Sequence, residues 1–185
     1  MGALLTDEEL VALAKEGNKK AFELLVERYY RQVYSFGLKM FNDRFWAEEL
    51  THEVFLKLHK KLDKFDPQFR FKPWFFKMAW NLAVDIWRRQ RPKSLIRVEL
   101  SEEHISKGAA DASDVLVRRE LWQEVSRKVE QLPPDMREAV YLRDFLGLSY
   151  REICEALGKP IGTIKTLIFR ARKRLLAELG ECLED

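Results

Sequence analysis

Hydrophobic residues recur every three or four positions along most of the chain, which is the spacing of amphipathic helices. One predicted helix runs from Asn18, its capping residue, to about Phe41 and carries Phe22, Leu25, Val26, Tyr29, Val33, Phe36 and Met40 on one face. Further helices are expected over about 44–62 and from Pro73 to about Arg91. Because strand-like alternation is not sustained over any useful length, the pattern predicts an all-α fold.

Cap and stop signals divide the pattern into short helices. Thr6 with Glu9, and Ser149 with Glu152, have the spacing of capping boxes, in which each side chain satisfies the other's backbone N–H. A helix is expected from Pro134 to Gly147. Gly158 then suits a helix end, and Pro160 suits the start of the next helix.

The apolar period is interrupted between residues 93 and 113, where Glu, Ser, Gly, Ala and Asp dominate. Helical spacing resumes at about Asp114. This composition is typical of a flexible linker. We therefore expect two small helical domains, 1–92 and 114–185.

Charge is unevenly distributed around this linker. Residues 70–97 contain eight basic side chains and one acidic side chain, and residues 159–174 contain six basic and no acidic ones. Residues 98–117 are predominantly acidic. Two basic blocks favour two contacts with a polyanion, although solvated charged faces are an open alternative.

The segment 149–175 has the pattern of a helix-turn-helix: a short helix, a tight turn with glycine, and a longer basic helix. At 100° per residue, the apolar positions of the longer helix fall on one side: Ile161, Ile164, Leu167, Ile168, Ala171 and Leu175. The opposite side holds Thr163, Lys165, Thr166, Phe169, Arg170 and Lys173. Basic and hydroxyl side chains of this kind read base edges and phosphates in the major groove. A hairpin with a solvated face is the alternative.

The helix from Pro73 to Arg91 is apolar around most of its circumference. Its narrow polar stripe consists of Lys77, Asn81, Asp85 and Arg88, with Trp74 among them. Aromatic rings beside cations suit unstacked single-stranded bases, whereas an ordinary core helix is the alternative. The helix 44–62 differs, because Leu56 stands among Glu49, His52 and Glu53 on its outer face, which is compatible with a basic protein partner.

Other functional classes receive little support. The hydrophobic fraction of 46% and charged fraction of 34% are typical of a well-charged globular protein, and no apolar run approaches the roughly 20 residues needed to span a bilayer. The acidic N-terminus does not resemble a secretory signal, so a cytoplasmic protein is expected. Cys154 and Cys182 lack metal-ligand spacing, and no cofactor, metal site or catalytic group is expected.

Together these motifs resemble the extracytoplasmic-function (ECF) sigma factors of bacteria. The segments 20–29 (KAFELLVERY), 47–58 (AEELTHEVFLKL) and 73–79 (PWFFKMA) are similar to their region 2. The segments 132–134 (LPP), 146–150 (LGLSY), 162–166 (GTIKT) and 170–172 (RAR) are similar to region 4. The resemblance implies a factor that binds core RNA polymerase and directs promoter-specific transcription initiation.

The resemblance also implies three sets of site residues. The β′ coiled coil of the polymerase would bind Glu48, Glu49, His52, Glu53, Leu56 and Lys57. The minus-ten element would be read and held open by Arg70, Lys72, Trp74, Lys77, Asn81 and Arg88. The minus-thirty-five duplex would contact Arg143, Tyr150, Arg151, Lys165, Thr166, Phe169, Arg170, Arg172 and Lys173. The implied partners are core polymerase, including its β flap, promoter DNA and an anti-sigma factor, without membrane contact.

This sequence departs from the usual family pattern at His52, Arg151 and Leu167. A one-component transcriptional regulator with the same helix-turn-helix is the second interpretation, but it gives no reason for the basic aromatic helix. An enzyme is the third and weakest interpretation. Formation of a complex with core polymerase would distinguish a sigma factor from a one-component regulator.

Overall fold

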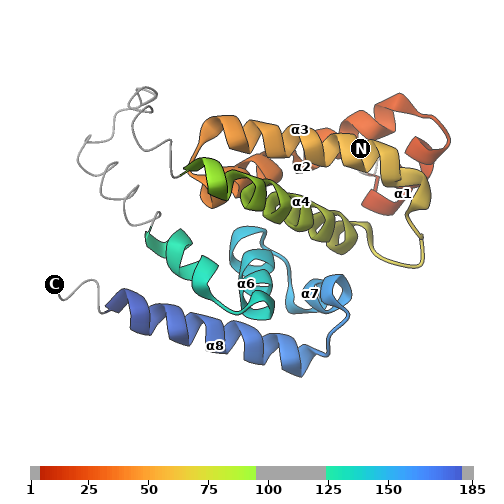
Figure 1. The fold of residues 1–185 in the computed structure, drawn as a ribbon. Helices are drawn as coiled ribbons and strands as arrows, with labels where there is room; N and C mark the ends of the chain where they lie inside the picture. Colours follow the sequence, from red (N-terminus) through yellow and green to blue (C-terminus); the bar gives the residue numbers. More distant parts are fainter. Residues whose placement is uncertain (1–4, 95–123, 181–185) are drawn as a thin grey trace, which may run out of the picture.

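The computed structural model describes residues 5–94 and 124–180, which are helical and contain no strand (Figure 1). The N-terminal region, 5–94, holds α1 (Asp7–Lys15), α2 (Lys19–Phe41), α3 (Arg44–Lys61), a 3₁₀ turn (Leu62–Lys64) and α4 (Phe71–Ser94). The C-terminal region, 124–180, holds a helix at 124–131, α6 (Pro134–Val140), a π-helical turn (Tyr141–Phe145), α7 (Tyr150–Leu157) and α8 (Ile161–Gly180). The predicted all-α class is confirmed. Helix α4 includes the first two residues of the predicted linker, and residues 95–113 lie outside the described ranges.

The predicted helix boundaries agree closely with the structure, because the capping residues act as expected. Both capping boxes are formed, at Thr6 with Glu9 and at Ser149 with Glu152. The Asn18 side chain accepts a hydrogen bond from the Ala21 N–H at 3.1 Å. Gly158 ends α7 with a φ of 63°, in the left-handed region that glycine adopts without strain.

Helices α2, α3 and α4 enclose the core of the N-terminal region. Phe36 of α2, Leu50 of α3 and Phe75 of α4 are completely buried in it. The close approach of α2 and α3 requires a glycine at position 37, since a Cβ there would lie 2.9 Å from the Cα of Ala47. These contacts fix the direction in which α3 and α4 present their outer faces.

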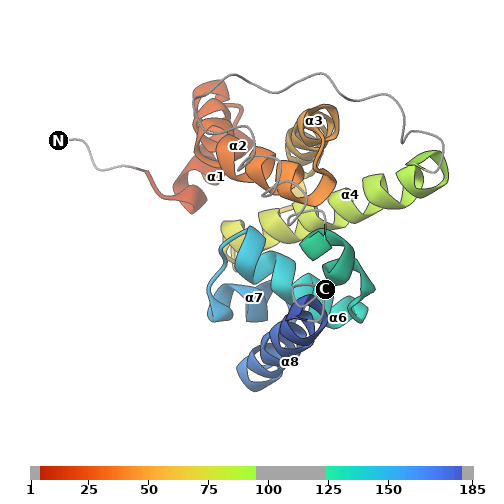
Figure 2. The same cartoon turned by 90° about the vertical axis from the view of Figure 1, so that its left-hand side faces the viewer.

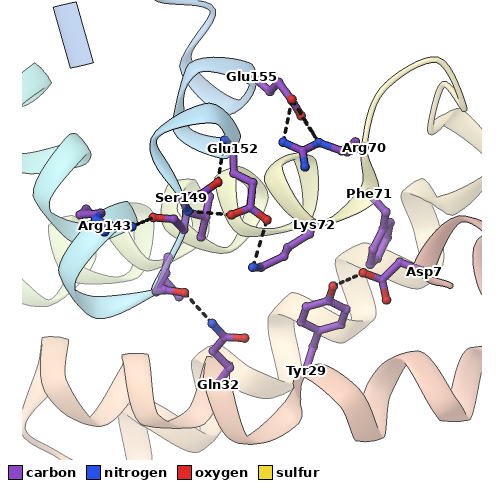
Figure 3. A network of polar contacts seen from close by, with 12 residues as sticks. Asp7, Tyr29, Gln32, Arg70, Phe71, Lys72, Arg143, Ser149, Glu152 and Glu155 are labelled. Carbon is purple, nitrogen blue, oxygen red and sulfur yellow. Dashed lines mark hydrogen bonds and ion pairs between the residues drawn. The ribbon is translucent and has the colours of Figure 1, made fainter. Parts of the chain in front are cut away.

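Helix α1 holds the connection between α3 and α4 in place. Its Glu8 carboxylate accepts a hydrogen bond from the Phe71 N–H at 3.1 Å, at the start of α4. The Lys15 ammonium donates to the Phe65 carbonyl at 3.0 Å. Asp7 accepts a hydrogen bond from the Tyr29 hydroxyl, and burial together with this carboxylate raises the pKa of Tyr29 (Figure 3). The loop that precedes α4 is therefore anchored at both ends.

The C-terminal region forms the predicted helix-turn-helix. Ile164, Ile168, Ala171 and Leu175 of α8 are buried, as expected from their spacing. Ile161 was expected on the same side but is 45% exposed, because it begins α8 next to the turn, where the inward face is not yet covered. The π-helical turn was not predicted. It contains the buried residues Tyr141 and Leu142 and leads into the turn at Gly147, whose φ is 69°.

Helix α4 is the part of the N-terminal region that faces the C-terminal region (Figures 1 and 2). On one side it packs against α2 and α3, and on the other against α7 and the π-helical turn. The Trp80 and Tyr141 rings have centroids 4.6 Å apart, and Gln32 of α2 donates a hydrogen bond to the Leu146 carbonyl. The two regions are thus packed together through α4, the helix that carries the predicted single-strand stripe.

Candidate nucleic-acid interface

Helix α8 presents a basic outer face, as the helical pattern predicts. Its outward side chains are all exposed: Thr163, Lys165, Thr166, Phe169, Arg170 and Lys173. Phe169 has 67% of its surface exposed. The Thr166 hydroxyl donates a hydrogen bond to the Gly162 carbonyl at 2.8 Å, and its oxygen can still accept a hydrogen bond. Cations, a hydroxyl and an aromatic ring on one exposed face match the side-chain types that contact duplex base edges.

The residues expected to assist α8 take different positions. Arg151 of α7 is exposed, whereas Arg143 is half-buried and donates to the Leu148 carbonyl at 2.7 Å. The Arg143 guanidinium also lies 4.9 Å from the centre of the Tyr150 ring. These contacts brace the turn that precedes α7, so Arg143 positions the motif. Arg172 pairs with Asp144 of the π-helical turn and fastens α8 to the rest of the region.

The polar stripe of α4 faces the C-terminal region. Lys77, Asn81, Asp85 and Arg88 line an open cavity of about 720 Å³, whose opposite wall includes Pro134, Arg137 and Glu138 of α6. Trp80, Trp87 and Tyr141 also line it. Trp80 and Tyr141 are buried against each other, whereas Trp87 is half-buried. The cavity therefore places cations beside the ring of Trp87, and cations beside an aromatic ring are a combination that binds unstacked bases.

Three of the cations expected at the minus-ten element are paired with carboxylates of the C-terminal region. Arg70 binds both carboxylate oxygens of Glu155, through Nε at 3.1 and 2.8 Å and through Nη2 at 2.7 Å, and Lys72 lies 3.0 Å from Glu152 (Figure 3). Lys77 pairs with Glu138. Burial opposes ionisation of Glu152, but hydrogen bonds from Ser149 and Lys72 outweigh it and lower the pKa of this carboxyl.

Trp74 is less available than its place on the stripe suggests. It is half-buried, with its ring 5.1 Å from the Phe65 ring and 6.0 Å from the Phe71 ring. Helical periodicity places Trp74 on the polar side of α4, but the loop before α4 folds back and brings Phe65 against it. This fold-back depends on contacts distant in sequence, which a periodic pattern does not contain.

The outer face of α3 is largely as predicted. Glu48, His52, Glu53 and Leu56 are exposed, and Leu56 is 40% exposed. Glu49 is half-buried beside them. Lys57, which belongs to the same predicted set, is half-buried and lines the cavity beside α4. The difference follows from the helical turn, because Lys57 lies about 100° beyond Leu56 around α3.

The acidic partners of the α4 cations could not be predicted from the sequence pattern. Glu138 and Glu155 were not identified, and Glu152 was recognised only as part of a capping box. Also missed was an aromatic stack beside the α3 face, in which the Tyr30 ring lies parallel to Phe55 at 6.4 Å and to Tyr34 at 6.3 Å. The i, i+4 spacing of Tyr30 and Tyr34 was a usable signal. The ion pairs between the N-terminal and C-terminal regions have no comparable signal in the sequence.

In the described ranges, His, Cys, Asp and Glu side chains form no group that could hold a metal ion. Within the same ranges, no helix has the length and apolar character required to cross a membrane.

Family comparisons match both regions. The family described as Sigma-70 region 2 matches residues 25–93, and the family described as Sigma-70, region 4 matches residues 122–175. The chain is 34% identical over 182 residues to the ECF RNA polymerase sigma-E factor of Escherichia coli K12, covering 95% of each protein. It is 32% identical over 186 residues to the RNA polymerase sigma-H factor of Pseudomonas aeruginosa PAO1, covering 97% of this chain and 96% of that protein.

Solved structures agree with this relationship. The fold matches that of CnrH, solved in complex with the cytosolic domain of CnrY, with a TM-score of 0.69 at 24% identity over 95% of this chain and 97% of that chain. It also matches the sigma factor RpoE of Bartonella quintana, solved with the anti-sigma factor NepR, with a TM-score of 0.58 at 25% identity over 87% and 98% of the two chains. With its region 2 and region 4 in this order, the chain belongs to the ECF family of bacterial RNA polymerase sigma factors.

Proposed function

We propose that this sigma factor divides promoter recognition between its two basic helices, with α8 reading the minus-thirty-five element as duplex. The observation that carries this assignment is the exposed face of α8, where Phe169 lies among Lys165, Thr166 and Arg170. An exposed ring on a basic face has an apolar partner in the thymine methyl group, while the cations reach guanine edges and phosphates. Tyr150, Arg151 and Lys173 support the same contact, and Arg143 and Arg172 hold the helix-turn-helix in position.

We assign the minus-ten element to α4 and the loop before it. Asn81 and Arg88 are exposed on the stripe, and Arg70, Lys72 and Lys77 extend its positive charge. The amide of Asn81 both donates and accepts hydrogen bonds, as a base edge requires. Trp74 supports the loop through Phe65 and Phe71. The proposed role of this surface is to capture bases that have left the duplex and so to hold the strands apart.

The polymerase contact is assigned to the outer face of α3. Glu48, Glu49, His52 and Glu53 surround Leu56, giving an acidic surface with an apolar centre that suits a basic helical partner such as the β′ coiled coil. Lys57 lies at the margin of this face. The C-terminal region is assigned to the β flap, and an anti-sigma factor would compete for these surfaces.

The proposed domain division follows these roles. Residues 1–92 bind the polymerase and the minus-ten element, 93–113 connect the domains, and 114–185 bind the minus-thirty-five element. The factor would act in the cytoplasm, where bacterial RNA polymerase transcribes DNA.

Permanganate footprinting separates the two proposed DNA contacts, because the reagent attacks unstacked thymines. On a duplex promoter, Asn81→Ala in α4 should leave closed-complex binding nearly intact and reduce thymine reactivity around the start site. Arg170→Ala in α8 should weaken the closed complex and change the preferred bases upstream, since one bidentate base contact gives about 1–3 kcal/mol of discrimination.

A template with a pre-melted bubble provides the matched control. The bubble should partly restore transcription by Asn81→Ala, because the strands no longer have to be opened, and should do little for Arg170→Ala. If both variants lose duplex binding equally and neither responds to the bubble, this division of roles is wrong.

A further inference from the structure

We propose that Glu8 and Lys15 of α1 are positioning residues for minus-ten recognition, because they hold the two ends of the loop 65–70 that precedes α4. Neither side chain would touch DNA. The inference rests on the proposed role of this loop and of α4 in capturing unpaired bases. It adds that α1 sets the geometry in which the loop meets a base, and that selection among bases at the minus-ten element depends on this geometry.

The loop is a short turn with an exposed tip. The Asp66 carboxylate accepts a hydrogen bond from the Gln68 N–H at 2.9 Å, and the Asp66 carbonyl accepts one from the Phe69 N–H at 3.1 Å. Gln68 and Phe69 are both exposed, Phe69 over 61% of its surface. An amide and an aromatic ring at this tip suit an unpaired base. The hydrogen bonds within the turn fix its shape but not its placement relative to α4.

Glu8 holds the end of the loop at which α4 begins. Its carboxylate accepts a hydrogen bond from the N–H of Phe71, the first residue of α4, at 3.1 Å. The first N–H groups of a helix have no partner within that helix, and a negative charge beside them is favourable. The first turn of α4 contains no acidic residue of its own, so Glu8 supplies this charge from another helix. The start of α4 is thereby tied to α1.

Lys15 holds the other end of the loop. Its ammonium donates to the Phe65 carbonyl at 3.0 Å, and the buried Phe65 ring packs against the rings of Phe71 and Trp74. Because Glu8 and Lys15 are seven positions apart, they lie on the same face of α1, about 10 Å from each other along its axis. Both contacts are made to backbone atoms of the segment 65–71. They therefore constrain the path of the loop whatever side chains the loop carries.

Helix α1 is itself fixed to the core and can serve as a support. Leu10 is buried, and Asp7 accepts a hydrogen bond from the Tyr29 hydroxyl of α2 (Figure 3). Glu8 and Lys15, by contrast, are exposed and do not belong to the core. Their removal should therefore release the loop while α1 stays in place.

The test compares the wild-type protein with a double variant, Glu8→Ala and Lys15→Met, which removes both anchors without changing the net charge. Hydrogen–deuterium exchange of the free protein should become faster in residues 65–71 and stay unchanged in the C-terminal region. Run-off transcription with core polymerase then uses templates with the preferred upstream element and a randomised minus-ten element. Loss of one hydrogen bond shifts an equilibrium about two- to tenfold, and enrichment of the preferred minus-ten bases should fall by a factor in this range.

Conservative variants distinguish positioning from a loss of stability. Glu8→Gln retains an oxygen that accepts from a backbone N–H, and Lys15→Arg retains a donor for a backbone carbonyl. Together they should restore slow exchange and the wild-type base preference. A variant that only loses stability would transcribe less from every template without changing the relative preference for bases.

The matched control is Lys20→Met combined with Glu23→Ala. This pair removes one exposed cation and one exposed carboxylate from α2, again without a change in net charge. Exchange in residues 65–71 and the preference at the minus-ten element should both remain those of the wild-type protein.

A loop variant, Gln68→Ala with Phe69→Ala, separates this inference from the proposed function. If the loop variant leaves the minus-ten preference unchanged, the proposed role of the loop fails. If the loop variant changes the preference but the variant of Glu8 and Lys15 does not, the loop reads DNA and its positioning by α1 is overturned. Unchanged exchange in residues 65–71 of the α1 variant would also overturn the inference, because the loop would then hold its place without these anchors.

Discussion

Trp80 and Tyr141 pack with their ring centroids 4.6 Å apart, across the boundary between the N-terminal and C-terminal regions. Tyr141 is only 1% exposed, and within the described residues its hydroxyl is buried without a hydrogen-bond partner. Burial raises the pKa of this hydroxyl. An unsatisfied buried hydroxyl favours separation of the regions, whereas the ring contact favours their packing. The boundary is therefore suited to opening as well as to closing.

Fragments 1–95 and 113–185 should each fold alone. Each contains fully or almost fully buried side chains, such as Phe36 and Phe75 in the first and Ile164 and Ile168 in the second, although these belong to one hydrophobic cluster in the full chain. We expect helical circular dichroism and cooperative melting from each, and salt-sensitive association when the two are mixed. A C-terminal fragment that stays unfolded would instead indicate a single fused domain.

Phe169→Ala should weaken recognition of the minus-thirty-five element. Loss of an apolar contact with a thymine methyl should reduce discrimination at that base, where a mismatched base pair typically costs about 1–3 kcal/mol. The matched control is Leu176→Ala on the same helix, where Leu176 is 73% exposed. The effect of each variant is measured by competition binding, in which holoenzyme is offered promoters that carry a substitution at each upstream base in turn. Equal effects of the two substitutions would show that Phe169 does not contribute to base recognition.

Glu53→Arg combined with Leu56→Glu should abolish binding to core polymerase without loss of helicity. The change reverses a charge and places a carboxylate at the apolar centre of the proposed interface. The control is Leu24→Glu combined with Glu27→Arg on α2, which has the same spacing, and both leucines are 40% exposed. Co-purification with core enzyme should fail only for the α3 pair, and unchanged co-purification would refute this interface.

Gly37→Ala should destabilise the N-terminal region. A Cβ at position 37 would lie 2.9 Å from the Cα of Ala47, and overpacking of this kind costs about 1–3 kcal/mol. The same substitution at Gly162 meets nothing within 4 Å and should not be destabilising. Chemical unfolding followed by circular dichroism compares them. A Gly37→Ala variant as stable as wild type would show that α2 and α3 separate easily.

Local features of the fold could be predicted because their causes lie within a few residues. Thr6 with Glu9 and Ser149 with Glu152 are capping signals contained in four residues, and both are formed. The buried side of α8 follows from its periodicity, except at Ile161, where the helix has only begun. The π-helical turn was missed because its apolar spacing resembles that of an ordinary helix end.

The candidate site was predicted less completely, for a physical reason. Whether a cation is available depends on what lies opposite it, and Arg70 faces a carboxylate that is 85 positions later in the chain. Neither composition nor periodicity contains this pairing. The surroundings of Lys57 and Trp74 could not be predicted for the same reason, because they are set by the packing of α4 and its loop.

Transcription with purified components tests the central claim most directly. Core RNA polymerase, this factor and a pool of DNA with randomised upstream sequence are combined, and the run-off transcripts are sequenced. We expect factor-dependent transcripts that begin at a fixed distance downstream of two shared sequence elements, one read as duplex by α8 and one opened by α4. Transcripts no more frequent or specific than those of core polymerase alone, from a protein that binds duplex DNA without polymerase, would contradict the account and indicate a one-component regulator.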